Sequence, residues 1–255
     1  MAAPVLRPLS TGEVLDTSFG LYRSLFAPLL IVALVCRTIP VVLGIYLQQL
    51  SSGSLAIFDH WALLLTNFVL AVVLSAIAVA ATTFIVSGAY LGHPMAGDIA
   101  LRKAFRLVGP LILVSIFSSI AIGLGFIVLF VPGVILLSGL VLATAVLVLE
   151  QPLSALGAMN RSWELTKGFR FKVLVSVFVA VLLFVVPMMI VSLMSAVGTW
   201  TGVWSPLISQ VLIGVLQIFV YPFFYIVITV LYYDLRVRKE GYDLELLATA
   251  TQPAA

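Results

Sequence analysis

Charged residues are scarce in this chain, with Asp, Glu, Lys and Arg making up 9% of its 255 residues. A soluble domain carries roughly 25% charged residues, so the composition argues against a soluble globular protein. The chain also has one cysteine, Cys36, and two histidines, His60 and His93. A lone cysteine forms no intrachain disulfide. Because the two histidines are predicted on opposite sides of a membrane, they cannot share a metal ion, and we expect neither metal nor cofactor.

Catalytic signatures are missing as well. The sequence contains no Walker A loop, no H-E-x-x-H and no G-x-S-x-G motif. No Asp or Glu falls in the middle of a long apolar run, where a coupled transporter usually places a carboxylate for its driving ion. We therefore expect that the protein is not an enzyme, and the sequence argues against a coupled transporter.

Apolar residues dominate what is present: 63% of the chain is hydrophobic, and the mean hydropathy is +1.25. Apolar runs of about 20 residues are long enough to cross a bilayer as helices. The sequence predicts an all-α integral membrane protein, a single domain over residues 1–255 with six spans. The spans are expected at about 28–50, 61–90, 109–130, 133–149, 171–197 and 206–233.

Three shorter segments, each more charged than the spans, precede the three pairs of spans, at about 11–26, 98–108 and 154–167. Apolar residues recur in them at helical spacing, which favours helices lying in the cytoplasmic interface. Ser10 and Glu13 have the spacing of a capping box at the start of the first segment. The order suggests a threefold repeat of interfacial helix and hairpin, followed by a cytoplasmic tail over 234–255.

Twelve of the thirteen Lys and Arg residues fall in four segments, within 7–23, 102–106, 161–172 and 236–239. Long apolar runs alternate with them, which predicts an even number of spans and cytoplasmic termini. The candidates for binding anionic lipid of the cytoplasmic leaflet are Arg102, Lys103, Arg106, Arg161 and Lys167. We call these five basic residues the collar. Alternatively, the collar binds a membrane or cytoplasmic protein partner. Nucleic-acid binding is disfavoured, because these residues lie at membrane ends of helices.

The thirteenth basic residue, Arg37, lies inside the first span, where an unpartnered cation is costly. One interpretation is structural, with Arg37 bonded to backbone carbonyls that Pro40 leaves free or to a polar neighbour. The other is functional, with Arg37 in a cavity holding an anion such as a lipid phosphate. Gln210 and Gln217 share a face of the sixth span and are expected to pack helices together.

Three stretches resemble a known group: R-P-L-S-T-G-E-V-L-D over 7–16, N-R-S-W-E-L-T-K-G over 160–168, and L-Y-Y-D-L-R-V-R-K-E-G-Y-D over 231–243. They are similar to the bacterial membrane-domain family named after the membrane portion of glycerophosphoryl diester phosphodiesterase. The resemblance implies a six-helix protein of the bacterial inner membrane. The family enzyme's paired histidines and metal carboxylates have no counterparts here, so it implies no catalysis.

The sequence favours a non-catalytic membrane module whose basic cytoplasmic collar binds lipid or a partner. The alternative is a transporter or permease subunit for a lipidic or amphiphilic substrate, which predicts a cavity reaching Arg37. In the expected tail, Asp234 and Arg238 are four residues apart on a helix. As an exposed pair they would contribute only about 0.2–0.5 kcal/mol.

Overall fold

The computed structural model describes residues 7–50, 60–242 and 244. Within these residues, six helical segments are long and apolar enough to cross a membrane, as the sequence predicted, and the fourth of them, Phe130–Leu149, consists of two shorter helices. In chain order the helices are α1 (Thr11–Ser24), α2 (Phe26–Leu50), α4 (Trp61–Tyr90), α5 (Gly97–Phe105), α6 (Val108–Val128), α7 (Phe130–Leu140), α8 (Ala143–Leu149), α9 (Ala155–Thr166), α10 (Arg170–Trp200) and α11 (Pro206–Glu240).

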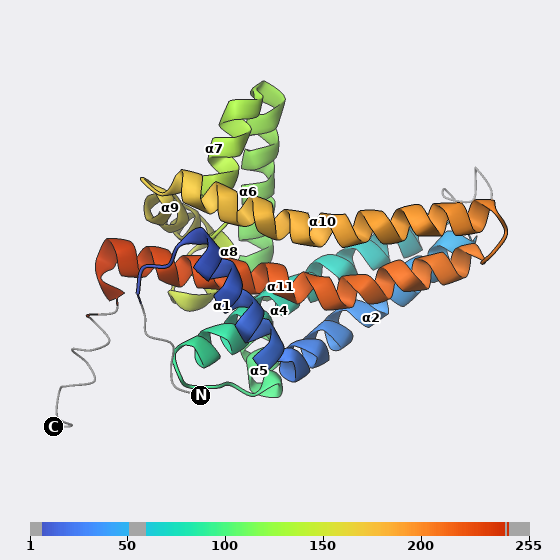
Figure 1. The fold of residues 1–255 in the computed structure, drawn as a ribbon, viewed down its shortest axis with the longest axis horizontal. Coiled ribbons are helices and arrows are strands. Elements are labelled where there is room, and N and C mark those ends of the chain that lie inside the picture. The colour runs from blue at the N-terminus through green and yellow to red at the C-terminus, as the bar shows by residue number, and fades with distance from the viewer. Residues whose placement is uncertain (1–6, 51–59, 243, 245–255) are drawn as a thin grey trace.

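The short helices α1, α5, α8 and α9 gather where the long hairpins meet, and we call this region the base (Figure 1). The hairpin of α2 and α4 and the hairpin of α10 and α11 extend from the base together. The hairpin of α6 and α7 points away from both. A short helix thus precedes each hairpin, but the superposition that a threefold repeat requires stays a prediction.

The start of α1 confirms the predicted capping box. The Ser10 backbone N–H donates to Glu13 Oε2 at 2.7 Å, and the Glu13 N–H donates to Ser10 Oγ at 3.3 Å. These bonds satisfy N–H groups that have no partner within the helix. The hydrogen bond from the Ser10 backbone, helped by Arg7, lowers the pKa of Glu13 to about 2. The Glu13 carboxylate therefore stays ionised at pH values well below those at which a glutamate ordinarily takes up a proton.

The second hairpin differs from its predicted boundaries. The predicted spans 109–130 and 133–149 leave a turn at Val131 and Pro132, but α6 ends at Val128 and α7 begins at Phe130, with Leu129 extended between them. Pro132 lies in the first turn of α7, where its missing N–H costs no helical hydrogen bond. The fourth span, expected as one helix over 133–149, is broken between Leu140 and Ala143 into α7 and α8.

The last span also departs from its prediction, because α11 continues to Glu240 instead of ending at 233. It stops at Gly241, which has a φ of 62°, the left-handed conformation that glycine adopts at helix ends. Residues 234–240, expected as a helix in the cytoplasmic tail, are helical, and Leu235 and Val237 are buried where an exposed tail was expected. The part of that tail from 245 onward lies outside the described residues.

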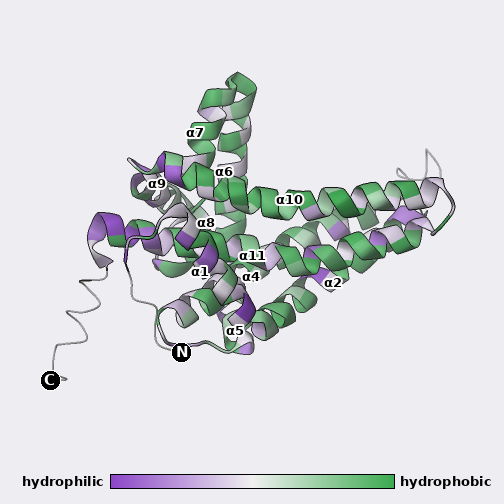
Figure 2. Ribbon diagram, in the orientation of Figure 1, coloured by the Kyte–Doolittle hydropathy of each residue, from purple (hydrophilic) through white to green (hydrophobic). Residues whose placement is uncertain are grey.

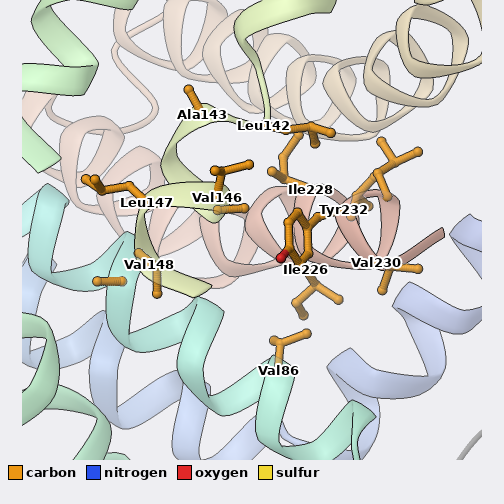
Figure 3. Close-up of a cluster of buried hydrophobic side chains, with 14 of the residues drawn as sticks. Val86, Leu142, Ala143, Val146, Leu147, Val148, Ile226, Ile228, Val230 and Tyr232 are labelled. Carbon is orange, nitrogen blue, oxygen red and sulfur yellow. The ribbon is translucent and has the colours of Figure 1, made fainter. Parts of the chain in front are cut away.

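The buried core lies at the base, where α8 packs against α4 and α11. Figure 3 shows Val146 of α8 on the side facing Ile226 and Tyr232 of α11, with Leu147 on the other side of α8, and all four side chains are buried. The hairpins farther out carry many exposed apolar side chains, and polar residues concentrate at the base (Figure 2). An apolar surface along helices of this length is what a surrounding bilayer would cover.

Candidate functional site

Arg37 lines a cavity of about 430 Å³ between α2, α4 and α11. The polar side chains that line the cavity with it are Gln48, Asn67, Gln210 and Gln217. Gln48 lies near the end of α2, and Asn67 and Gln210 lie near the starts of α4 and α11. These helix ends are the ones far from the base (Figure 1), so the cavity occupies the half of the bundle distant from the collar.

Arg37 has an aromatic partner but no carboxylate. Its guanidinium lies 3.7 Å from the centre of the Tyr221 ring, a cation–π contact. A second cavity of about 350 Å³, on the side of Ser75 and Ser115, also reaches Arg37. Across residues 7–50, 60–242 and 244, no acidic side chain pairs with Arg37 and no backbone carbonyl accepts its hydrogen bond. In the structure Arg37 thus faces a cavity. It is not hydrogen-bonded to the backbone carbonyls near Pro40, contrary to what the structural interpretation expected.

Two of the amides that line this cavity have a carbonyl oxygen without a hydrogen-bond donor. The carbonyl oxygens Asn67 Oδ1 and Gln210 Oε1 are buried and find no donor in the described part of the chain. A buried acceptor without a donor is unfavourable unless water or a ligand supplies one. Gln210 was expected to bind a neighbouring helix through its amide, and for this oxygen the structure shows no such bond. Sequence reasoning had not connected Gln48 or Asn67 with Arg37.

A second concave site lies at the base, beside α5. Lys103 and Arg106 line a groove of about 400 Å³, together with the apolar Phe84, Leu107 and Leu149. The Lys103 ammonium lies 5.9 Å from the centre of the Phe84 ring. Both basic side chains are exposed, and no acidic residue that the structure describes forms an ion pair with either. The groove therefore combines free positive charge with an apolar wall.

The other basic residues of the collar differ in whether their charge is free to bind an anionic ligand. Arg102 and Lys167 are exposed at the base. Arg161 instead pairs with Glu150 at 2.8 Å and with Glu240 at 2.5 Å. Burial lowers the pKa of Arg161, but its hydrogen bonds to these two carboxylates outweigh burial and raise the pKa above its ordinary value. Arg161 thus joins α9 to the ends of α8 and α11, and its charge is already neutralised.

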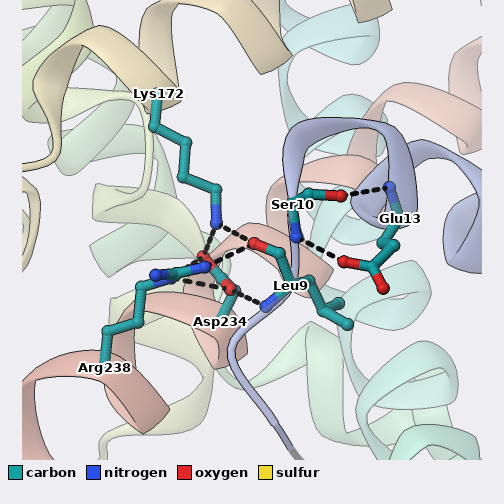
Figure 4. Close-up of polar contacts among 6 residues, drawn as sticks. All are labelled: Leu9, Ser10, Glu13, Lys172, Asp234 and Arg238. Atoms are coloured by element: carbon teal, nitrogen blue, oxygen red, sulfur yellow. Dashed lines mark hydrogen bonds and ion pairs between the residues drawn. The ribbon is translucent and has the colours of Figure 1, made fainter.

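Asp234 forms a second buried network, which corrects the prediction of an exposed pair (Figure 4). Its side chain is fully buried and accepts hydrogen bonds from the Leu9 N–H at 2.7 Å and from Arg238 Nε at 3.1 Å. Lys172 of α10 also pairs with Asp234, and both Lys172 and Arg238 donate to the Leu9 carbonyl at 2.5 Å. Asp234 thereby links the N-terminal segment, α10 and α11.

The fold defines a multi-pass helical membrane protein with a polar intramembrane cavity and a basic groove at its base. Comparison of the chain with protein-family models, curated proteins and solved structures finds no match.

Proposed function

We propose that this protein is a non-catalytic membrane module that binds anionic phospholipid at its basic groove. The groove of Lys103 and Arg106 carries the proposal, because a lipid head group and an acyl chain need charge and an apolar wall side by side. Phe105 and Ile99, on the same short helix, are 67% and 47% exposed. These apolar side chains would enter the bilayer next to the head groups that the cations bind.

The orientation follows from the same chemistry. Basic residues at the base favour its placement on the cytoplasmic side, with both termini there. The resemblance of 7–16, 160–168 and 231–243 to the bacterial membrane-domain family supports a bacterial inner membrane. The described residues of the three stretches lie near or in the base elements α1, α9 and the end of α11. A protein partner that docks on this basic surface is the alternative occupant of the collar.

The test of the groove is lipid retention by the Lys103→Gln, Arg106→Gln double variant. Each basic residue near an anionic surface contributes about 1 kcal/mol, so affinity for phosphatidylglycerol should fall roughly 30-fold. Native mass spectrometry of detergent-solubilised protein, titrated with phosphatidylglycerol or phosphatidylcholine, measures this. Arg23→Gln, on exposed Arg23 of α1, is the matched control and should bind as the wild type does. Unchanged binding in the double variant would reject the groove as the site.

A transporter or permease subunit for an amphiphilic substrate is the second candidate, favoured by the cavity at Arg37. Arg37 would then lie on the substrate's path through the membrane. Reconstituted wild-type protein should move a fluorescent phospholipid between leaflets, and Arg37→Leu should reduce that movement to the rate of empty liposomes. Movement at the empty-liposome rate in the wild type itself would leave the binding module as the function.

A further inference from the structure

We infer that the cavity at Arg37 is a second lipid site, which binds the phosphate-containing head group of a phospholipid within the membrane. The phosphate would lie at the Arg37 guanidinium, and head-group O–H or N–H donors at Asn67 and Gln210. This site is separate from the groove at α5 and does not depend on the function proposed for that groove. The chemistry of its lining residues identifies the ligand.

The positive charge of Arg37 favours an anion at this depth. Arg37 lies in the middle of an apolar span, where a charged side chain is tolerated when it faces a cavity or a partner. Tyr221 covers one face of the guanidinium, but the N–H groups of guanidinium point outward in its plane. Those groups form the planar fork that pairs with phosphate oxygens through two parallel hydrogen bonds.

The amides of Asn67 and Gln210 line the same cavity, and each amide oxygen accepts from a hydrogen-bond donor of a ligand once its side chain turns toward the cavity. A simple anion such as chloride supplies none. A phospholipid head group with hydroxyl or ammonium groups supplies both the phosphate and the donors. Gln48 and Gln217 add further polar groups to the wall of the cavity. The lining is therefore complementary to a polar anionic head group and not to an acyl chain.

The size and position of the cavity fit a lipid. A volume of about 430 Å³ is within the range of small-ligand sites. Gly44 keeps one wall open, because a Cβ there would lie 3.6 Å from Asn67 Nδ2 and a longer side chain would enter the cavity. A lipid from the bilayer half distant from the base could place its head group here, with its acyl chains remaining against the apolar helix surfaces.

Native mass spectrometry with added phosphatidylglycerol or phosphatidylethanolamine tests the site through two different variants. Arg37→Leu removes the charge, and Gly44→Leu fills the cavity with the charge in place. Arg37→Leu should weaken retention of this lipid about tenfold or more, because it removes a charge-assisted hydrogen bond, and Gly44→Leu should weaken it by a similar factor, because its side chain occupies the space of the head group. Gly123→Leu, at an α6 glycine with open space around it, is the control and should retain the lipid. The Lys103→Gln, Arg106→Gln variant should also retain it, which separates the two sites.

A cysteine at Gln217 tests the occupant directly, in a background where buried Cys36 is replaced by Ala. A charged, water-soluble thiol reagent should modify Gln217→Cys, and added phospholipid should slow the modification. Val215→Cys, at an exposed position of the same helix, should stay unmodified in the bilayer. Protection by inorganic phosphate but not by phospholipid would overturn the lipid assignment. Equal lipid retention by wild type, Arg37→Leu and Gly44→Leu would overturn the site itself.

Discussion

Replacing Asp234 with alanine should destabilise this protein more than any other single change at its base. Asp234 is fully buried and is the carboxylate partner of Lys172 and Arg238. Removing one partner of a buried ion pair leaves uncompensated charge and typically costs about 3–5 kcal/mol. We expect the lower end of that range, because Lys172 and Arg238 remain 15% and 26% exposed to water.

The loss should extend to the N-terminal segment. The Leu9 N–H donates to Asp234, so Asp234→Ala also leaves a buried backbone donor without its acceptor. Thermal unfolding in detergent measures the total effect, and limited proteolysis reports the release of the segment before α1. Asp234→Asn retains an oxygen for the Leu9 N–H and should lie between wild type and alanine.

The control for this experiment is Asp16→Ala. Asp16 is an exposed acidic residue of α1, and its replacement should change stability by at most about 0.5 kcal/mol. A similarly small change in stability for Asp234→Ala would contradict the conclusion that the Asp234 carboxylate holds the N-terminal segment, α10 and α11 together. It would also restore the exposed-pair interpretation that the spacing of Asp234 and Arg238 first suggested.

The sequence could predict the spans and the start of α1 because those features are local. The apolar run of α2 depends on its own length and composition, and the Ser10–Glu13 capping box closes within four residues. Asp234 could not be placed in the same way. Its partner Leu9 is 225 residues away, and Lys172 is 62 residues away, so only the folded chain brings them together.

The cavity at Arg37 also combines a residue that the local sequence singles out with residues that only the folded chain brings to it. Arg37 is conspicuous in the sequence, because a cation inside an apolar run demands an explanation. Gln48 and Asn67 are near span ends, where polar residues are ordinary, so nothing local links them to Arg37. The break between α7 and α8 was also missed, because residues 130–149 read as one apolar run and a glycine such as Gly139 is common within membrane helices.

Gly139 is the second position where a small change should have a large effect. It lies near the end of α7, and an added Cβ would lie 2.2 Å from Cε3 of the Trp163 ring in α9. The ring has little room to move, because the Arg170 guanidinium stacks 3.8 Å from its centre. The neighbouring Ser162 hydroxyl donates to the Gly139 carbonyl at 2.7 Å, which fixes α9 against α7.

Gly139→Ala should therefore push α9 outward and cost about 1–3 kcal/mol, the usual penalty for overpacking a tight contact. Displacing α9 would also strain the pairing of Arg161 with Glu150. Gly123→Ala is the matched control, because its Cβ meets open space within a helix and should stabilise by as much as about 1 kcal/mol. Melting temperatures of the two variants in one detergent should shift in opposite directions. A shared upward shift would mean that the alanine methyl at Gly139 fits without moving Trp163, and that this glycine does not position α9.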